Sequence, residues 1–367
     1  MSLGIIDADT HIAESESMWQ HLGKEWYHRR PVIVSVPDDT LYREQTAVWL
    51  IDGNIFPKPA GMGGSLLITP SAAKRQVMRK DITVGSRELT DPKGRIKDMD
   101  RLSIDTQVVY PTLFLVQLTG DVGLEVALCR AYNRFMAEAC SNGHNRLRWI
   151  AIPPLRSVEE SISEMRWAKE NGAVGLFFRG MENDLNIDQP YFFPIYEEAA
   201  KLDLAICIHQ AMGSPTIAQL FDIQQHSTFP QSRLLPLIAF RNIVANKIPE
   251  RFPGLRFGFI EACAGWIPFL LHHLRRSLRQ RWKFSSSVDL FREYRLFVAC
   301  EADEDIPYLL QFTGEDHLVI GSDYGHPDAS EEPELVAVMR ARKDVSNEVN
   351  EKILSDNAQA LYGLGRS

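Results

Sequence analysis

The stretch GIIDADTHI (residues 4–12) is a short apolar run in which polar side chains recur at every second position. Side chains alternate between the two faces of a β-strand, so Asp7, Asp9 and His11 share one face. A charged side chain inside a protein needs an ion-pair partner or a bound metal, because burying an unpaired charge costs much free energy. The stretch therefore predicts a buried strand that carries a row of metal-binding or paired side chains.

Seven further apolar runs follow, at residues 106–113, 147–155, 173–180, 204–210, 255–262, 296–302 and 317–324. Most are nearly continuous in Val, Ile, Leu and Phe, which is typical of parallel strands buried on both faces. Helical patterns separate them, at residues 95–103, 123–142, 157–171, 192–202, 233–247, 267–281, 303–312 and 334–361, the last as two helices.

Eight strands that alternate with helices predict a (β/α)8 TIM barrel, formed as a single domain by residues 1–367. A doubly wound parallel sheet is the structural alternative. It is disfavoured because no Gly-x-Gly-x-x-Gly motif follows the first strand.

Residues 15–89 form a segment that is too long for a simple connection between a strand and a helix. It contains a strand pattern at residues 47–51, followed by the turn dipeptide Asp52-Gly53. We expect it to be an insertion that covers the C-terminal face of the barrel like a lid, where barrel active sites lie. Its large aromatic side chains are expected to form the core of the insertion, with contact to substrate as the alternative. They are Trp19, Trp26, Trp49 and Phe56.

The charge balance argues against a nucleic-acid partner. Lys plus Arg is 40 and Asp plus Glu is 48, so the net charge is −8 and the pI is about 5.7. The five cysteines are an odd number, and we expect all of them to be reduced. No run reaches the roughly 20 apolar residues that span a bilayer, and no secretion signal is evident. We therefore expect a cytoplasmic protein without a membrane partner.

Further imidazole and carboxylate side chains lie where the later strands are expected to end. They are His209, Glu261, Asp323 and His326. The C-terminal ends of barrel strands meet at one rim, so these groups are expected to lie near Asp9 and His11. Their mixture of nitrogen and oxygen donors suits Zn, Fe or Mn. A metal with an open coordination position activates bound water and polarises a substrate oxygen.

Five motifs occur in order along nearly the whole chain, most of them at expected strand ends. They are Ile6-Asp7-Ala8-Asp9-Thr10-His11; Ile208-His209; Phe252-Pro253-Gly254-Leu255-Arg256 leading to Glu261-Ala262-Cys263-Ala264-Gly265-Trp266; Gly321-Ser322-Asp323-Tyr324-Gly325-His326-Pro327; and Lys352-Ile353-Leu354-Ser355-Asp356-Asn357-Ala358 through Leu361-Tyr362-Gly363. Together they resemble the amidohydrolase superfamily, in the branch similar to aminocarboxymuconate-semialdehyde decarboxylase and related metal-dependent hydrolases.

The resemblance implies a metal centre that departs from the pattern of that superfamily at two positions. The first-strand motif of the superfamily is His-x-His, whereas this chain has Asp9 followed two positions later by His11. The ligand histidine of the fifth strand matches His209, and the eighth-strand aspartate, a ligand and proton acceptor, matches Asp323. The catalytic histidine that follows the sixth strand is replaced by Glu261.

The lysine that bridges two metals in other branches is absent from the sequence Phe178-Arg179-Gly180, so a lysine-bridged pair of ions is not expected. We expect one divalent ion rather than two, with Zn preferred over Fe or Mn. The expected metal ligands are Asp9, His11, His209, Asp323 and Glu14. The expected acid–base groups are Asp323 and Glu261. The side chains expected to orient ligands or to contact substrate are His326, Arg179 and Asp7.

Three of these residues have a purely structural alternative. Glu14 could cap the start of the insertion, and Glu261 could form an ion pair with an arginine such as Arg256. Arg179 could bind a substrate carboxylate bidentately, or it could neutralise the carboxylates of the barrel itself.

The function that we expect is hydrolysis of a small organic substrate that carries a carboxylate, amide or ester group, with a metal-activated water and a carboxylate base. The alternative is non-oxidative decarboxylation of an aromatic or unsaturated acid, in which the base instead becomes the acid that protonates carbon. Oxygen chemistry at two irons and a non-catalytic binding module are less favoured. We also expect a homodimer. The sequence does not name the substrate, because specificity lies in the insertion and loops.

Overall fold

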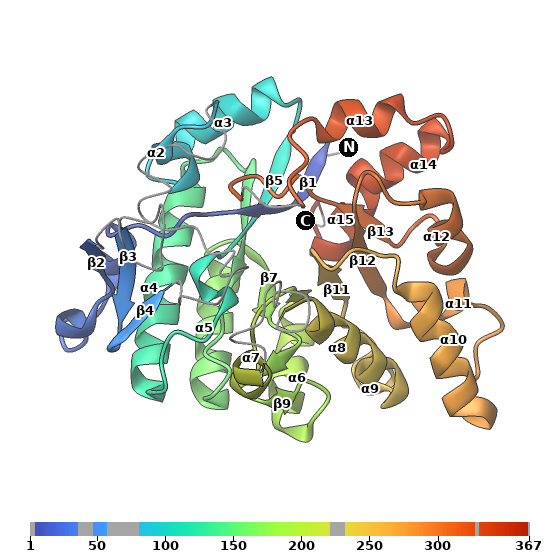
Figure 1. Cartoon of the computed structure of the whole chain (residues 1–367), viewed down its shortest axis with the longest axis horizontal. Helices are drawn as coiled ribbons and strands as arrows, with labels where there is room; N and C mark the ends of the chain where they lie inside the picture. The colour runs from blue at the N-terminus through green and yellow to red at the C-terminus, as the bar shows by residue number, and fades with distance from the viewer. Residues whose placement is uncertain (1–3, 36–46, 57–80, 221–231, 327–329, 366–367) are drawn as a thin grey trace.

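Eight parallel strands form one sheet in the computed structural model, which describes residues 4–35, 47–56, 81–220, 232–326 and 330–365 (Figure 1). Neighbours in the sheet follow the order of the chain, so each helical connection leads to the adjacent strand. The strands are β1 (Ile6–His11), β5 (Thr106–Tyr110), β6 (Leu147–Ala151), β7 (Ala173–Phe178), β10 (Ala205–His209), β11 (Phe257–Ile260), β12 (Leu296–Cys300) and β13 (Leu318–Ile320). All eight predicted strands are confirmed.

The sheet closes into a barrel between its first and last strands. The amide of His11 donates to the Tyr324 carbonyl at 2.7 Å, and the amide of Asp323 donates to the Asp9 carbonyl at 3.1 Å. A parallel bridge pairs Thr10 with Tyr324. The TIM barrel prediction is therefore confirmed, and the contacts that close the barrel lie among the residues expected at the site.

Helices surround the barrel at the expected places (Figure 1). They are α3 (Pro92–Arg101), α4 (Val122–Ser141), α5 (Val158–Glu170), α6 (Phe193–Lys201), α8 (Leu234–Ala245), α10 (Ile267–Leu278) and α12 (Ile306–Thr313). Their starts are encoded locally, because Asp91, Asp121, Ser157 and Asp305 each accept a hydrogen bond from a first-turn amide. The C-terminal segment contains α13 (Leu335–Ala341), α14 (Asn347–Glu351), a π-helical turn (Lys352–Asp356) and α15 (Asn357–Tyr362).

Several short elements were not predicted from the sequence. Helix α11 (Ser287–Tyr294) precedes β12, and α10 ends at Leu278 rather than at residue 281 because Arg279 has a φ of 39°. The other helices are α2 (Val84–Arg87), α7 (Pro215–Leu220) and α9 (Ile248–Arg251), with 3₁₀ turns at Met18–His21, Tyr27–Arg29, Leu113–Leu115, Pro190–Phe192 and Arg279–Arg281. A small hairpin joins β8 (Met181–Glu182) to β9 (Leu185–Asn186).

The described part of the insertion contains a three-stranded antiparallel sheet of β2 (Val32–Ser35), β3 (Ala47–Ile51) and β4 (Asn54–Phe56). The predicted strand and its turn are present, and both Asp52 and Gly53 have a positive φ. Trp49 and Phe56 are buried, and the Trp49 ring meets the Trp19 ring edge-on at 6.1 Å. These aromatic side chains therefore belong to the core of the insertion.

Arg29 joins the insertion to the N-terminal end of α4, because its guanidinium pairs with Asp121 at 2.6 Å and also with Asp52. That end of α4 follows the loop that leaves the C-terminal end of β5, so the described part of the insertion lies at the predicted end of the barrel (Figure 1). Residues 36–46 and 57–80 of the insertion lie outside the described residues, as do residues 221–231 of the other long connection. The lid therefore stays a prediction.

Within the described residues, every helix is too short or too polar to cross a lipid bilayer.

Candidate metal centre

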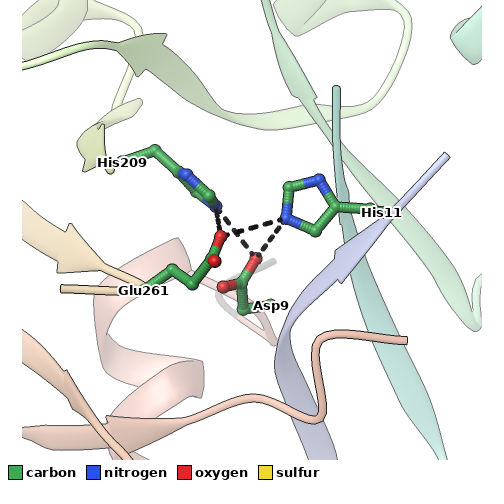
Figure 2. A group of neighbouring side chains, drawn as sticks. All are labelled: Asp9, His11, His209 and Glu261. Atoms are coloured by element: carbon green, nitrogen blue, oxygen red, sulfur yellow. Dashed lines mark hydrogen bonds and ion pairs between the residues drawn. The ribbon is translucent and has the colours of Figure 1, made fainter. Parts of the chain in front are cut away.

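Five polar side chains converge at the C-terminal end of the barrel. Asp9 and His11 come from β1, His209 ends β10, Glu261 follows β11, and Asp323 follows β13. All five are buried, with relative exposures between 0% and 6%. Figure 2 shows four of them turning their polar atoms toward one point. Residues separated by as many as 314 positions are thus brought together because parallel barrel strands end at one rim.

Both histidines are held with one ring nitrogen directed toward this point. Nδ1 of His11 lies 2.9 Å from the Pro111 carbonyl oxygen, and Nδ1 of His209 lies 2.9 Å from the Gln210 carbonyl oxygen. A carbonyl oxygen only accepts hydrogen bonds, so each Nδ1 carries a proton. When each ring is neutral, Nε2 presents a lone pair to the centre, which is the tautomer that binds a metal.

The spacing of the donor atoms fits one ion. Nε2 of His209 lies 3.2 Å from Oε2 of Glu261 and 3.4 Å from Oδ1 of Asp9. Nε2 of His11 lies 3.5 Å from Asp9 Oδ1, and 3.6 Å from both Glu261 Oε2 and Asp323 Oδ1. Ligand atoms about 2.1 Å from one ion in a tetrahedral shell lie about 3.4 Å apart. The donors therefore have the separation that a shared cation would give them.

The charges at the centre favour a cation as well. Burial lowers the pKa of His11, but hydrogen bonds with Asp9 and Glu261 and their negative charges outweigh it and raise that pKa to about 10. Burial raises the pKa of Asp9, but the electrostatic interaction with His209 and hydrogen bonds from both histidines outweigh it and hold that pKa well below its usual range. The carboxylates of Asp9 and Glu261 thus hold a proton on the His11 imidazole, and a metal ion can take the place of that proton.

Two sets of possible metal-binding groups can be drawn from the described residues. One is Asp9, His11, His209 and Glu261, and the other is His11, Glu261, Asp323 and His326. Both sets contain His11 and Glu261. Nδ1 of His11 is engaged by a carbonyl, so His11 has only Nε2 to offer, and this atom binds one ion. The two sets therefore cannot both be complete at the same time.

His326 lies behind Asp323. Its Nδ1 is 2.9 Å from Asp323 Oδ1, and its Nε2 is 2.8 Å from the hydroxyl of Thr112. The ring also stacks on that of His11, with 3.7 Å between the centroids. Since Nδ1 donates to the carboxylate, Nε2 accepts the Thr112 hydroxyl proton. His326 thus contacts the Asp323 carboxylate and is itself held by Thr112.

Asp7 joins the two strands that close the barrel beneath the site. Its carboxylate accepts the Ser322 amide at 2.8 Å and the Ser322 hydroxyl at 2.5 Å. The amide of Gln107 lies 3.4 Å away, and the fully buried Arg95 donates to Gln107 at 2.8 Å. Burial raises the pKa of Asp7 to about 6 despite these hydrogen bonds. Asp7 therefore anchors the residue that precedes Asp323.

Two of the predicted site residues do not join the cluster. The Glu14 carboxylate accepts the backbone amides of Thr112 at 3.0 Å and Leu113 at 2.8 Å, so it caps the turn after β5. Arg179 pairs with Glu182 at 2.5 Å and donates to the Phe114 carbonyl at 2.8 Å. In the described part of the chain, Glu14 thus caps the turn after β5 rather than the start of the insertion, and Arg179 pairs with a carboxylate of the β8–β9 hairpin rather than with one of the barrel strands.

Three residues that support the site were not predicted from the sequence. The Gln210 amide donates to Oε1 of Glu261, Thr112 supports His326, and Arg95 supports the carbonyl of His11 at 2.8 Å. Gln210 directly follows a predicted ligand at a strand end, which is the one local clue. Thr112 and Arg95 reach the site only through tertiary contacts.

The chain matches known proteins over most of its length. The amidohydrolase family profile matches residues 6–364. The 2-amino-3-carboxymuconate-6-semialdehyde decarboxylase of Dictyostelium discoideum is 26% identical over 287 residues, which cover 75% of this chain and 77% of that protein.

Two solved structures share the fold. An amidohydrolase from Mycobacterium avium subsp. paratuberculosis superposes with a TM-score of 0.76 at 19% identity, covering 98% of this chain and 99% of that one. A 5-carboxyvanillate decarboxylase from Novosphingobium aromaticivorans, solved as a mutant with bound manganese and 3-methoxy-4-hydroxy-5-nitrobenzoic acid, superposes with a TM-score of 0.68 at 20% identity and covers 98% and 97%. The resemblance inferred from the motifs is confirmed: the chain belongs to the amidohydrolase family and is an enzyme of that superfamily, either a hydrolase or a carboxy-lyase.

Proposed function

We propose that this enzyme is a metal-dependent decarboxylase of an aromatic or unsaturated carboxylic acid. The observation that carries the proposal is that a curated relative matched over three quarters of this chain is a decarboxylase of an unsaturated acid. A solved structure with the same fold is a decarboxylase of an aromatic acid. These relatives support the decarboxylase alternative better than the hydrolysis that we expected first.

We assign the metal to Asp9, His11, His209 and Asp323. Nε2 of His11 lies 3.5 Å from Asp9 Oδ1 and 3.6 Å from Asp323 Oδ1, and Nε2 of His209 lies 3.4 Å from Asp9 Oδ1. With carboxylate oxygens and imidazole nitrogens both present, the donor set suits Mn as well as Zn. Manganese bound in the 5-carboxyvanillate decarboxylase adds support for that ion. A divalent ion bound here supplies a positive charge that polarises the substrate oxygens.

Decarboxylation breaks the bond between a carbon atom and its carboxylate, and the electron pair stays on that carbon. CO₂ leaves, and a proton must reach the carbon in its place. Glu261 is the better placed donor of that proton, because it accepts a hydrogen bond from the neutral Gln210 amide while its Oε2 faces the centre. Asp323 instead accepts a hydrogen bond from Nδ1 of His326, whose ring is held by Thr112, and a hydrogen bond donated to a carboxylate favours its ionised form.

The test is a comparison of two reaction classes with the purified, metal-loaded enzyme. One panel contains ortho-hydroxylated and methoxylated benzoic acids together with unsaturated amino acids that carry a second carboxylate. The other contains esters, amides and lactones of similar size. We expect CO₂ release from at least one acid, abolished by a chelator and restored by Mn²⁺ or Zn²⁺. Turnover confined to the esters, amides or lactones would contradict the proposal.

A further inference from the structure

The turn that presents Glu261 has an unfavourable backbone conformation. Glu261 and Cys263 have φ angles of 52° and 55°, in the left-handed region that residues with a side chain seldom adopt. Two such residues within three positions cost free energy, so the surrounding structure must hold them in place. The direction of the Glu261 side chain depends on this turn, because its backbone angles set where its Cβ points.

A carboxylate from the neighbouring strand end binds the backbone of this turn. Both oxygens of Glu304 lie 3.0 Å from the Ala264 amide, and Oε1 also accepts the Gly265 amide at 2.7 Å. Oε2 accepts the amide of Glu301, the first residue after β12, at 2.9 Å. One carboxylate thus binds three backbone amides from the turns that follow β11 and β12.

The fit between Glu304 and the turn is close. A Cβ added to Gly265 would lie 3.3 Å from Oε1 of Glu304, so the glycine lets the carboxylate approach its amide. Glu304 is itself fixed from behind, because the Arg342 guanidinium donates to its carbonyl at 3.0 Å and to that of Ala302 at 2.5 Å.

Two carbonyls of the turn are bound as well. The indole nitrogen of Trp266 donates to Ala262 at 3.0 Å and to Cys263 at 2.9 Å. The strained backbone is therefore bound through its amides by Glu304 and through its carbonyls by Trp266. Of the two, only Glu304 bears charge, and it also joins this turn to the next strand end.

We propose that Glu304 is a positioning residue, which holds the turn after β11 in its left-handed conformation so that Glu261 faces the metal centre. The inference rests on the proposed role of Glu261 in the reaction. Glu304 does not touch the metal-binding side chains, so its effect must pass through the backbone of residues 261–265.

The variant to test is Glu304→Gln, in the full-length chain. It keeps the length and shape of the side chain, but its NH₂ group cannot accept a hydrogen bond, so either Gly265 or Glu301 loses its acceptor. The hydrogen bonds that remain are weaker, because the acceptor no longer carries a charge. The matched control is Asp305→Asn, which makes the same change at the next residue. Asp305 caps α12, because its carboxylate accepts the Tyr308 amide at 3.1 Å, and this hydrogen bond does not involve residues 261–265.

Amide hydrogen exchange in the metal-free protein tests the positioning without any activity. We expect residues 261–265 to exchange at least tenfold faster in Glu304→Gln than in the wild type or Asp305→Asn, while the barrel strands keep their protection. Unchanged exchange across the turn would overturn the proposal. If Glu304→Gln does not fold, Glu304→Asp, which retains a charged carboxylate on a shorter side chain, takes its place.

A double-mutant cycle then connects the turn to the reaction. A misplaced catalytic group can cost about 10²-fold in rate, so we expect a loss of 10- to 100-fold in kcat for Glu304→Gln with little change in KM. In a Glu261→Gln background the same change should cost almost nothing further, because the group that it positions is gone. Losses that multiply would overturn the proposal. If Glu261→Gln alone turns over normally, the assigned acid is wrong, and hydrogen exchange still decides whether Glu304 holds the turn.

Discussion

Nε2 of His209 lies 3.2 Å from Oε2 of Glu261, although the two residues end different strands and neither is exposed. The same nitrogen lies 3.4 Å from Oδ1 of Asp9, so a single imidazole nitrogen faces two carboxylates. Such an arrangement is stable with a proton or with a metal between the groups.

His209→Ala should remove the metal, because an ion deprived of one ligand is held by an incomplete shell. The barrel core is apolar and independent of the ion, so we expect the variant to fold with a native circular dichroism spectrum. Elemental analysis after dialysis should find about one ion per chain in the wild type and little in His209→Ala. The control His273→Ala, at an exposed position of α10, should keep its metal. Full occupancy in His209→Ala would refute the ligand assignment.

Glu261→Gln separates a proton donor from a ligand. If Glu261 delivers the proton, the variant keeps its metal and loses roughly 10²–10⁴-fold in kcat. If Glu261 binds the ion, metal content falls together with turnover. We expect the first result. Normal turnover with the metal retained would leave Glu261 without either role.

Metal affinity should fall as the pH falls. The pKa of His11 is raised to about 10 in the metal-free protein, so this ring is protonated at neutral pH and must release its proton when the ion binds. If binding displaces one proton, the dissociation constant of the metal should rise about tenfold each time the pH is lowered by one unit below that pKa. Titrations of Mn²⁺ at pH 6, 7 and 8 check this, and a dissociation constant that does not change with pH would contradict it.

Trp49→Ala should destabilise the protein, because the indole is 3% exposed and packs edge-on against Trp19. Removing a buried tryptophan side chain costs about 3–5 kcal/mol in the free energy of unfolding. The control is Phe269→Ala, whose side chain is 72% exposed and whose loss should cost about 0.5 kcal/mol or less. Denaturant unfolding measures both. A change confined to substrate affinity would instead place Trp49 against the substrate.

The sequence was sufficient to predict the eight strands, because most of them are nearly continuous apolar runs whose burial on both faces is visible locally. The cluster could be predicted from the strands, since Asp9, His11, His209 and Asp323 all lie at or just after the C-terminal ends of strands in one barrel. The position of Glu14 did not follow, because its two backbone partners lie 98 and 99 residues away and belong to an irregular turn. The turn bound by Glu304 was equally hidden, since left-handed residues other than glycine leave no compositional mark. Helix α11 was missed because it is short and follows an irregular segment.

The product formed in D₂O tests the central claim most directly. If the enzyme is a decarboxylase, each CO₂ released from the acid substrate leaves one deuterium on the carbon that carried the carboxylate, and Glu261→Gln slows both events together. Mass spectrometry and NMR of the product measure this incorporation. A product with its carboxylate intact and an ester or amide bond cleaved, formed without CO₂, would show that the enzyme is a hydrolase and contradict the account.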